Sequence, residues 1–392
     1  MWLSALLNHG VLVFLFLSFV LWQFLCDLIG NRPFTSCVGT VRWIFNVLIS
    51  FFLGSVFLLD QVNRRTFLRV FLGCTLLSCI IACLELALGH TFWSMLHLEA
   101  IAADPNLVHS LTSTKFRTGL MRPASLFAHP IVFGQFLAAS LPLTWAIISP
   151  VRNASLRLFG YMLLPLIVGN IAFNIYATSS RSALLVLAGS SATAIVLVAS
   201  FRKSRLRYSF THMGLYFCVA SLSLYLLAGQ FLGPLVSGRN NEELTSTLGR
   251  QAMLERCFAQ IRYSPVFGYG ADMSGTLAGL STPDNLVTLD SLYLAVFLDF
   301  GYVGVGIFVL LIGAVLFAGF RAAERVQNPH LARIIGCMLA FIVSIMIGQS
   351  VLGIGDNLFY VFLMAAYFVT SRRSLTREAG CTIGDCDQTA CK

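Results

Sequence analysis

The chain has very little charge for its length. Only 11% of its 392 residues are Asp, Glu, Lys or Arg, whereas 57% are hydrophobic. A soluble globular domain carries roughly 25% charged residues and about 45–50% apolar residues. The chain therefore lacks the charge that a water-facing surface needs, which excludes an ordinary soluble domain. Its 33 phenylalanines and its mean hydropathy of +0.81 indicate a protein whose apolar side chains face lipid.

Several motifs that carry chemistry are also absent. The sequence has no His–Glu spacing of a metal site, no glycine-rich nucleotide loop and no Ser–His–Asp order of a hydrolase. The cysteines do not predict a disulfide framework, because several lie inside apolar runs and Cys381, Cys386 and Cys391 recur at every fifth residue near the end. We therefore expect no cofactor, no metal ion and no nucleic-acid partner.

Apolar runs of the length of a membrane span follow one another along the chain. A helix that crosses the hydrocarbon core needs about 20 residues. Backbone polar groups must be paired inside the bilayer, so these segments are expected to be helices and the fold all-α. About ten spans are predicted, at Leu3–Leu25, Val41–Leu59, Phe67–Leu88, Ile131–Ile148, Leu158–Ala177, Ala183–Ser200, His212–Leu232, Leu292–Phe317, Ile334–Leu352 and Leu358–Thr370.

The positions of Lys and Arg predict which side of the membrane each loop faces. Short cytoplasmic loops are rich in these residues, and most of the 26 Lys and Arg lie in the loops of one side and in the C-terminal segment. Both termini are therefore predicted to be cytoplasmic, and residues 372–392 to form a disordered tail. The start lacks the basic segment of a signal peptide, so the first helix is expected to stay uncleaved.

Residues 1–371 are predicted to form one polytopic membrane domain with two long external loops, at about 89–127 and 233–290. Loops of this length are uncommon unless they bind something, act as lids or are disordered. In the second loop, Gly249–Tyr263 has apolar residues at helical spacing, which predicts an amphipathic helix at the membrane interface. A proline and two glycines then end it.

Six residues at the external ends of these helices are candidates for a binding site. The arginine fork pairs with two phosphate oxygens at once, so an arginine cluster at head-group level suits a polyprenyl diphosphate. Other roles stay open: an isolated interfacial Arg can simply reach towards water, Arg250 can orient the amphipathic helix against anionic lipid, and Asp290 can cap the eighth span. The candidates are Arg122, His129, Arg181, Arg250, Arg262 and Asp290.

Two carboxylates fall within predicted spans. Glu85 lies near the external end of the third span, and Asp299 lies roughly 13 Å deeper than Asp290 at 1.5 Å per residue. Carboxylates inside a membrane are costly and often functional. A proton relay and a hydrogen bond to neighbouring helices are both open for Asp299. A lipid-linked glycan flippase or a secondary transporter is therefore an alternative class, although no internal repeat is evident.

Four segments resemble, in order, motifs of the bacterial O-antigen ligase/polymerase superfamily. Arg122–Leu143 resembles its Arg–hydrophobic–His-Pro segment, and Ala177–Ser190 resembles its Ser-Arg-Ser helix start. Gly249–Met273 is similar to its large external loop, which ends in Pro-x-x-Gly-x-Gly. Leu289–Phe308 is similar to the segment that follows, which ends in Gly-x-x-Gly-x-Gly. Together the four segments span about half of the chain.

The resemblance implies inverting, metal-independent glycosyl transfer on the external face of the bacterial inner membrane. The donor is a glycan on undecaprenyl diphosphate, and the acceptor is a sugar hydroxyl. It implies that Arg181 and Arg250 hold the diphosphate with help from Arg122, Arg262 or His129. Asp290, together with Arg250, is then the catalytic group.

Asp290 also indicates which branch of the superfamily, polymerase or ligase, the chain resembles more. Ligases of the superfamily commonly carry a His at the position of Asp290, whereas polymerases more often carry an acidic or amide residue. A polymerase of repeat units, making O-antigen or exopolysaccharide, is therefore favoured, with a ligase that transfers the glycan to lipid A-core as the alternative. The expected partners are the lipid-linked oligosaccharide, membrane lipids, a chain-length regulator and a flippase.

Overall fold

The structure, a computed structural model, describes most of the chain. The described residues are 10–30, 41, 44–96, 105–117, 119–148, 154–202, 241–281, 287–326, 328–351 and 357–384. Within them the chain is helical apart from two short antiparallel hairpins. The prediction of an all-α membrane fold is thus confirmed for the scaffold, with two small hairpins in the loops added to it.

The chain divides into two compact units, each made of segments distant in the sequence. The first is Met1–Ser55, Ser204–Arg321 and Gln349–Val369, and the second is Val56–Lys203, Ala322–Gly348 and Thr370–Lys392. Three helices, α4, α15 and α17, run from one unit into the other. The single domain expected for residues 1–371 stays a prediction.

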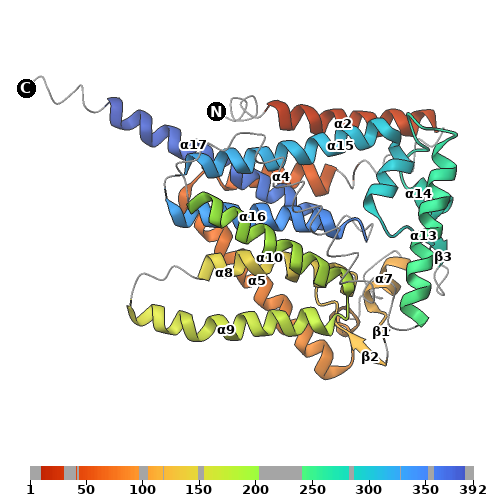
Figure 1. Cartoon of the computed structure of the whole chain (residues 1–392), viewed down its shortest axis with the longest axis horizontal. Helices are drawn as coiled ribbons and strands as arrows, with labels where there is room; N and C mark the ends of the chain where they lie inside the picture. Colours follow the sequence, from red (N-terminus) through yellow and green to blue (C-terminus); the bar gives the residue numbers. More distant parts are fainter. Residues whose placement is uncertain are drawn as a thin grey trace, which may run out of the picture. The chain divides into compact units, whose positions relative to one another are not determined.

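The first unit is a helical bundle with a loop module at one end (Figure 1). Its elements are α2 (Gly10–Ile29), the π-helix η1 (Ile44–Ile49), α4 (Ser50–Phe57), α13 (Asn241–Ile261), α14 (Met273–Ala278), β3 (Leu280–Ser281) paired with β4 (Val287–Thr288), α15 (Leu292–Arg325) and α17 (Leu358–Gly384).

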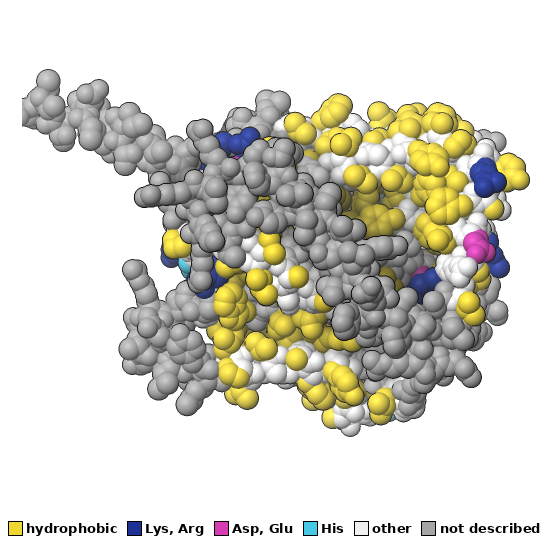
Figure 2. Space-filling view, viewed as in Figure 1, with side chains coloured by type: hydrophobic (Ala, Val, Ile, Leu, Met, Phe, Trp, Pro, Cys, Tyr) yellow, Lys and Arg dark blue, Asp and Glu magenta, His cyan; other side chains and the backbone are white. Residues whose placement is uncertain are grey.

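Helix α2 has the surface of a membrane helix. Its exposed large side chains recur every three or four residues and are all apolar, whereas its buried face carries Gln23 and Asp27 beside phenylalanines. Figure 2 shows hydrophobic side chains along the outward surface of this helix. An exposed stripe of this length is stable where lipid covers it. The stripe consists of Val11, Phe14, Leu17, Leu21, Phe24 and Leu28.

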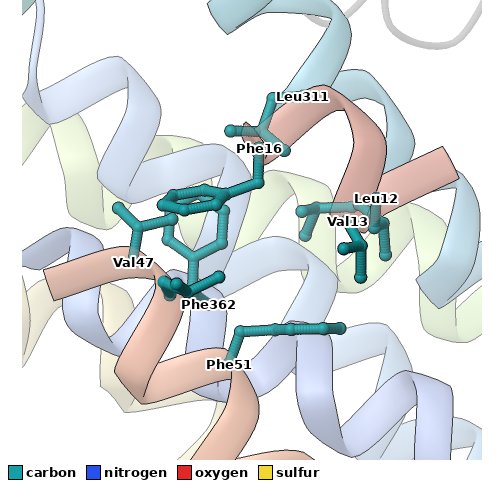
Figure 3. A pocket seen from close by; sticks show the side chains of 9 residues that line it. Leu12, Val13, Phe16, Val47, Phe51, Leu311 and Phe362 are labelled. Atoms are coloured by element: carbon teal, nitrogen blue, oxygen red, sulfur yellow. The ribbon is translucent and has the colours of Figure 1, made fainter. Parts of the chain in front are cut away.

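The interior of the first unit is packed with aromatic rings. Phe19 of α2 lies edge-on to Phe300 and also contacts Phe308 of α15, with ring centroids 5.8 Å apart in each pair. Between α2, η1, α4, α15 and α17 a pocket remains, lined by apolar side chains such as Phe16, Phe51 and Leu311 (Figure 3). The lining has no polar group that could orient a sugar or a phosphate.

The second unit packs three helices closely around a polar bridge. Gln135 of α8 donates through Nε2 to Ser182 Oγ of α10 (3.3 Å) and to Gly348 O of α16 (3.2 Å). Phe71, Phe136 and Phe341 form an aromatic cluster beside it. The elements are α5 (Gln61–Leu88), α6 (Phe92–Met95), α7 (Pro105–Thr112), β1 (Lys115–Arg117) paired with β2 (Leu120–Arg122), α8 (Pro130–Ile148), α9 (Ala154–Ala177), α10 (Arg181–Arg202) and α16 (Pro329–Gly348).

The predicted spans can be compared with these helices. In the described part of the chain, 6 helices are long and apolar enough to cross a membrane, and shorter apolar helices cover Val47–Phe57, Leu164–Ala177 and Leu358–Ser371. Nine of the predicted spans correspond to these helices, and the span at His212–Leu232 lies outside the described residues. The chain is a multi-pass membrane protein.

Two predicted boundaries are wrong. The amphipathic helix begins at Asn241 rather than Gly249 and ends at Ile261, so Arg250 lies within the helix instead of opening it. Helix α17 continues to Gly384, so residues 372–384 of the predicted disordered tail are helical. Residues 385–392 lie outside the described part.

Candidate functional site

Arg250 and Asp290 meet in the first unit. Arg250 Nε of α13 lies 3.4 Å from Asp290 Oδ2, which stands just before α15. The two side chains are 33% and 26% exposed, so a ligand can reach them. The backbone nitrogen of Asp290 lies 3.5 Å from Met253 Sδ, one turn along α13 from Arg250. The structure therefore brings these two predicted site residues together, and their role as a binding and catalytic site stays a prediction.

Asp290 does not cap α15. Ser291 does: its Oγ accepts the backbone N–H of Leu294 (3.4 Å), which leaves the Asp290 carboxylate for Arg250. Burial raises the pKa of Asp290, and the neighbouring Arg250 opposes this rise. A carboxylate with a raised pKa is a better general base near neutral pH than an ordinary exposed one.

Arg262 does not join this pair. It follows the last residue of α13 and is exposed, twelve positions beyond Arg250. At 1.5 Å per residue this spacing corresponds to roughly 18 Å along the helix axis. The prediction that Arg262 helps Arg250 hold one diphosphate is therefore not supported, because Arg250 lies in the middle of α13 and Arg262 just beyond its end.

Arg122 braces a turn in the second unit. It is 8% exposed, and its Nε donates to Thr178 O (2.6 Å) in the turn between α9 and α10. Arg117 of β1, which the sequence analysis did not single out, donates through Nη1 to the next carbonyl, Ser179 O (2.8 Å). Burial, with a smaller contribution from Arg117, lowers the pKa of Arg122 to about 10, so it stays charged. Both arginines therefore stabilise carbonyls at the C-terminal end of α9.

Arg181 is the first residue of α10 and is partly buried. The preceding Ser180 caps the helix, because its Oγ accepts the N–H of Ala183 (3.3 Å) and bonds to Ser182 Oγ (2.9 Å). Ser179 has a left-handed backbone (φ 48°), which makes the turn tight. The turn thus presents Arg181 at the positive end of a helix, where an anion is favoured.

His129 is a neutral helix cap. Its Nδ1 accepts the N–H of Ile131 (3.1 Å) at the start of α8, so the ring proton resides on Nε2. Burial, then Arg122 and Lys115, lower the pKa of His129 to about 3. The ring is therefore uncharged at neutral pH, and a direct ionic contact to a diphosphate stays a prediction without support from this geometry.

The two carboxylates predicted inside spans both bind loop backbone. Glu85 is fully buried and accepts the N–H groups of Phe92, Ala124 and Ser125. Asp299 accepts Ser274 N (2.7 Å) and Ser274 Oγ (3.2 Å).

A third buried carboxylate was missed. Asp27 accepts the N–H of Ala271. The first span was predicted to end at Leu25, before Asp27, so this acidic residue in an apolar helix was assigned to a loop. Among the described residues no group of three or more His, Cys, Asp or Glu side chains could hold a metal ion.

The middle of the chain matches a known family. A family model described as O-antigen ligase matches residues 166–309, a range that includes Arg181, Arg250 and Asp290. No curated protein matches the chain. The family consists of membrane enzymes that resemble glycosyltransferases, in agreement with the helices and motifs described above. The resemblance seen in the sequence is thereby confirmed for residues 166–309, which are similar to the O-antigen ligase family of membrane proteins.

Proposed function

We propose that the chain is a membrane glycosyltransferase that polymerises undecaprenyl-diphosphate-linked oligosaccharide repeat units into O-antigen or exopolysaccharide. The pairing of Arg250 with Asp290, inside the region that matches the O-antigen ligase family, carries this proposal. Arg250 is a partly exposed cation on α13, and Asp290 is a partly exposed carboxylate just before α15. Together they supply what the reaction needs. These are a partner for a phosphate and an acceptor for a hydroxyl proton.

In the proposed reaction Arg250 binds phosphate oxygens of the donor. Its guanidinium has five N–H donors, and Asp290 lies on the Nε side. Negative charge grows on the diphosphate as the bond from the anomeric carbon to its oxygen breaks. A fixed cation at that position stabilises the transition state more than the ground state.

Asp290 acts on the acceptor. The acceptor hydroxyl oxygen attacks the anomeric carbon on the face opposite the diphosphate, its proton passes to the Asp290 carboxylate, and undecaprenyl diphosphate leaves as the anion. The new bond therefore has inverted anomeric configuration. The atoms and charges balance without a nucleotide sugar or a metal ion.

The choice of a polymerase rests on Asp290. Ligases of the superfamily commonly carry a His at this position, so the acidic residue favours the polymerase branch. A ligase that transfers glycan to lipid A-core is the second candidate, favoured by the description of the matching family. Transport is not proposed, because Glu85 and Asp299 are both engaged by loop backbone.

Location and partners belong to the same proposal. The reaction would take place on the external face of the bacterial inner membrane, with both chain termini in the cytoplasm. A flippase that delivers the repeat unit and a chain-length regulator would be its partners. Arg181 remains a proposed diphosphate ligand and is tested by its own substitution.

Substitution of the pair tests the proposal. In a deletion strain complemented with Arg250→Ala, Asp290→Ala or Arg181→Ala, we expect glycan of a single repeat unit, because loss of one such charge costs on the order of 100-fold or more in rate. Polymer length on gels, with the membrane level of each variant measured by immunoblot, is the readout. Arg256→Ala is the matched control, since Arg256 is exposed on the same helix and its side chain donates to Gly279 O rather than to Asp290. Wild-type polymer from well-expressed Arg250→Ala and Asp290→Ala would refute the assignment.

A further inference from the structure

Helix α15 is broken at Gly301. This residue has φ 65° and ψ −170°, far from helical values. A Cβ atom there would overlap the carbonyl oxygen of Val266, so only glycine fits. The break divides the helix into a first segment, residues 292–300, and a longer remainder. Asp290 stands just before the first segment, and Asp299 lies near its end.

Four backbone groups at the break bond to partners outside α15. No water is available inside a bilayer, so each unpaired group there would cost several kcal/mol. The partners come from residues 265–274, here named the clasp, and from a tryptophan of α2. The clasp consists of the loop after α13 and the first two residues of α14. The bonds, each 2.9 Å, are Tyr269 N to Leu298 O, Gly270 N to Asp299 O, Tyr302 N to Pro265 O, and Trp22 Nε1 to Phe300 O.

Two buried carboxylates hold the clasp from different helices. Asp299 belongs to the first segment of α15 itself and binds Ser274 through its backbone N and its Oγ. Asp27 belongs to α2 and binds the N–H of Ala271. Both side chains are almost fully buried. The Asp299 bonds therefore lock the clasp to the first segment of α15, whereas the Asp27 bond locks it to the bundle.

The first segment of α15 is held both at its start and along its side. At its start, Leu292 N donates to Gln349 O (3.0 Å). Along its side, Phe297 and Leu298 form one core cluster with Cys257 and Ile261 of α13 and with Ala278 of α14. A short, packed helix moves as one body, so a shift at its Asp299 end also changes the position of its Asp290 end.

We propose that Asp299 is a positioning residue for the reaction: by tying the clasp to the first segment of α15, it holds Asp290 at its distance from Arg250. This inference rests on the proposed function for the role of Asp290. It assigns Asp299 a task that needs no proton transfer, although the residue lies deep in a membrane helix. A displacement of about 1 Å at a reacting group can lower a rate by about 100-fold.

Hydrogen exchange tests the positioning without any substrate. The full-length protein in lipid nanodiscs is compared as wild type, Asp299→Ala and Asp27→Ala, with peptide-resolved mass spectrometry. Both substitutions remove a carboxylate that binds the clasp, so both are expected to speed exchange in residues 268–275. Only Asp299→Ala is expected to speed exchange in residues 289–294. Equal exchange of residues 289–294 in wild type and Asp299→Ala would overturn the proposal.

A pH–rate profile tests the consequence for catalysis. The substrate is the lipid-linked repeat unit extracted from the deletion strain, and the rate of chain extension is measured across pH. Arg250 is the charged side chain that acts on Asp290 in the described part of the chain, and it opposes the rise in the pKa of Asp290. Displacing Asp290 from Arg250 therefore raises this pKa further, so the acid limb of the profile moves to higher pH.

Asp299→Ala is expected to lower the rate by about 10- to 100-fold and to move the acid limb upward. Asp27→Ala should lower thermal stability and leave the limb in place. Asp299→Asn should behave much more like wild type than Asp299→Ala does, because its amide oxygen can accept the backbone N–H groups of Ser274 and Asp272 and its NH₂ can donate to Ser274 Oγ. If Asp299 instead relayed a proton, Asp299→Asn would be inactive, because an amide does not titrate.

Two further variants keep the outcomes distinct. If Asp299→Ala does not fold, Ser274→Ala serves in its place, because it removes only the Oγ bond. It should move the acid limb of the pH–rate profile in the same direction by a smaller amount. Asp290→Asn tests the proposed function itself, because full activity of this variant would show that Asp290 is not the general base. The exchange experiment would still test the positioning role of Asp299, since it needs no substrate. A slower Asp299→Ala enzyme with an unmoved acid limb, or an inactive Asp299→Asn enzyme that folds, would overturn the proposal.

Discussion

Three carboxylates within apolar helices perform the same physical task in this molecule. Asp27, Glu85 and Asp299 each accept backbone N–H groups from a loop at the end of the helix that carries them. A carboxylate has about four acceptor sites, so one side chain can satisfy several amides in a place that water cannot enter. Acidic residues in these spans are therefore anchors for the loops that surround the candidate sites.

Glu85 offers the clearest test of this anchoring. Glu85→Gln replaces one acceptor oxygen by an NH₂ group, which then faces a backbone N–H of Phe92 or those of Ala124 and Ser125. We expect the free energy of unfolding to fall by about 2 kcal/mol, because a buried donor loses its partner. Denaturant unfolding in detergent measures it.

The matched control for Glu85→Gln is Glu255→Gln. Glu255 is exposed on α13 and accepts a hydrogen bond from the exposed Gln251, so its substitution should change the free energy of unfolding by less than about 0.5 kcal/mol. Equal stability of the two variants would show that Glu85 does not anchor the loop.

Residue types could be predicted at this scale, but partners could not. The sequence marks Asp290 as a residue at a helix start, and the neighbouring Ser291 was an equally good cap by composition. Which of them caps depends on the approach of Arg250 from a helix forty residues earlier. The task of Arg122 likewise depends on a turn 56 positions away.

Among the elements, the break in α15 has the strongest consequence. Hydropathy predicts one uninterrupted span here, because glycine is common in membrane helices and a single glycine does not reveal its dihedral angles. The Pro-x-x-Gly-x-Gly motif was interpreted as the end of a helix. It in fact supplies the backbone N–H groups that fill the break, with Gly268 and Gly270 in left-handed conformations against α15 and α2.

Two glycines of α15 separate the effect of the break from that of helix packing. Gly301→Ala should lower the free energy of unfolding by about 3 kcal/mol or more, because alanine is strained at this φ and its Cβ overlaps Val266. Gly306→Ala, in open space on the same helix, should be neutral or stabilising by about 0.5–1 kcal/mol. Thermal unfolding and the yield of monodisperse protein are the measurements. A Gly301→Ala variant as stable as Gly306→Ala would contradict the clasp.

Helix lengths explain why part of the predicted site did not assemble. Arg250 and Arg262 were expected to serve one diphosphate because both flank the predicted amphipathic segment. Once α13 is known to run unbroken between them, the rise per residue separates them by roughly 18 Å. The start of α13 could not be predicted, because Asn241–Ser246 is polar and shows no apolar periodicity.

For the whole molecule, composition and hydropathy were enough to predict the membrane class. Lack of charge excludes a soluble fold whatever the packing, and span length follows from bilayer thickness. The division into two compact units was not predictable, since each unit joins segments more than a hundred residues apart. Motif order was enough to find the resemblance to the family, and the match over residues 166–309 agrees with it.

Reconstitution from purified components tests whether this chain itself joins lipid-linked repeat units. The purified full-length protein is placed in liposomes with the undecaprenyl-diphosphate-linked repeat unit extracted from the deletion strain, without lipid A-core, and products are resolved by length. With wild-type protein we expect a ladder of two or more repeats, and with Asp290→Ala we expect none. The proposed function would be contradicted if wild-type protein gave no extension, or if glycan moved only to added lipid A-core.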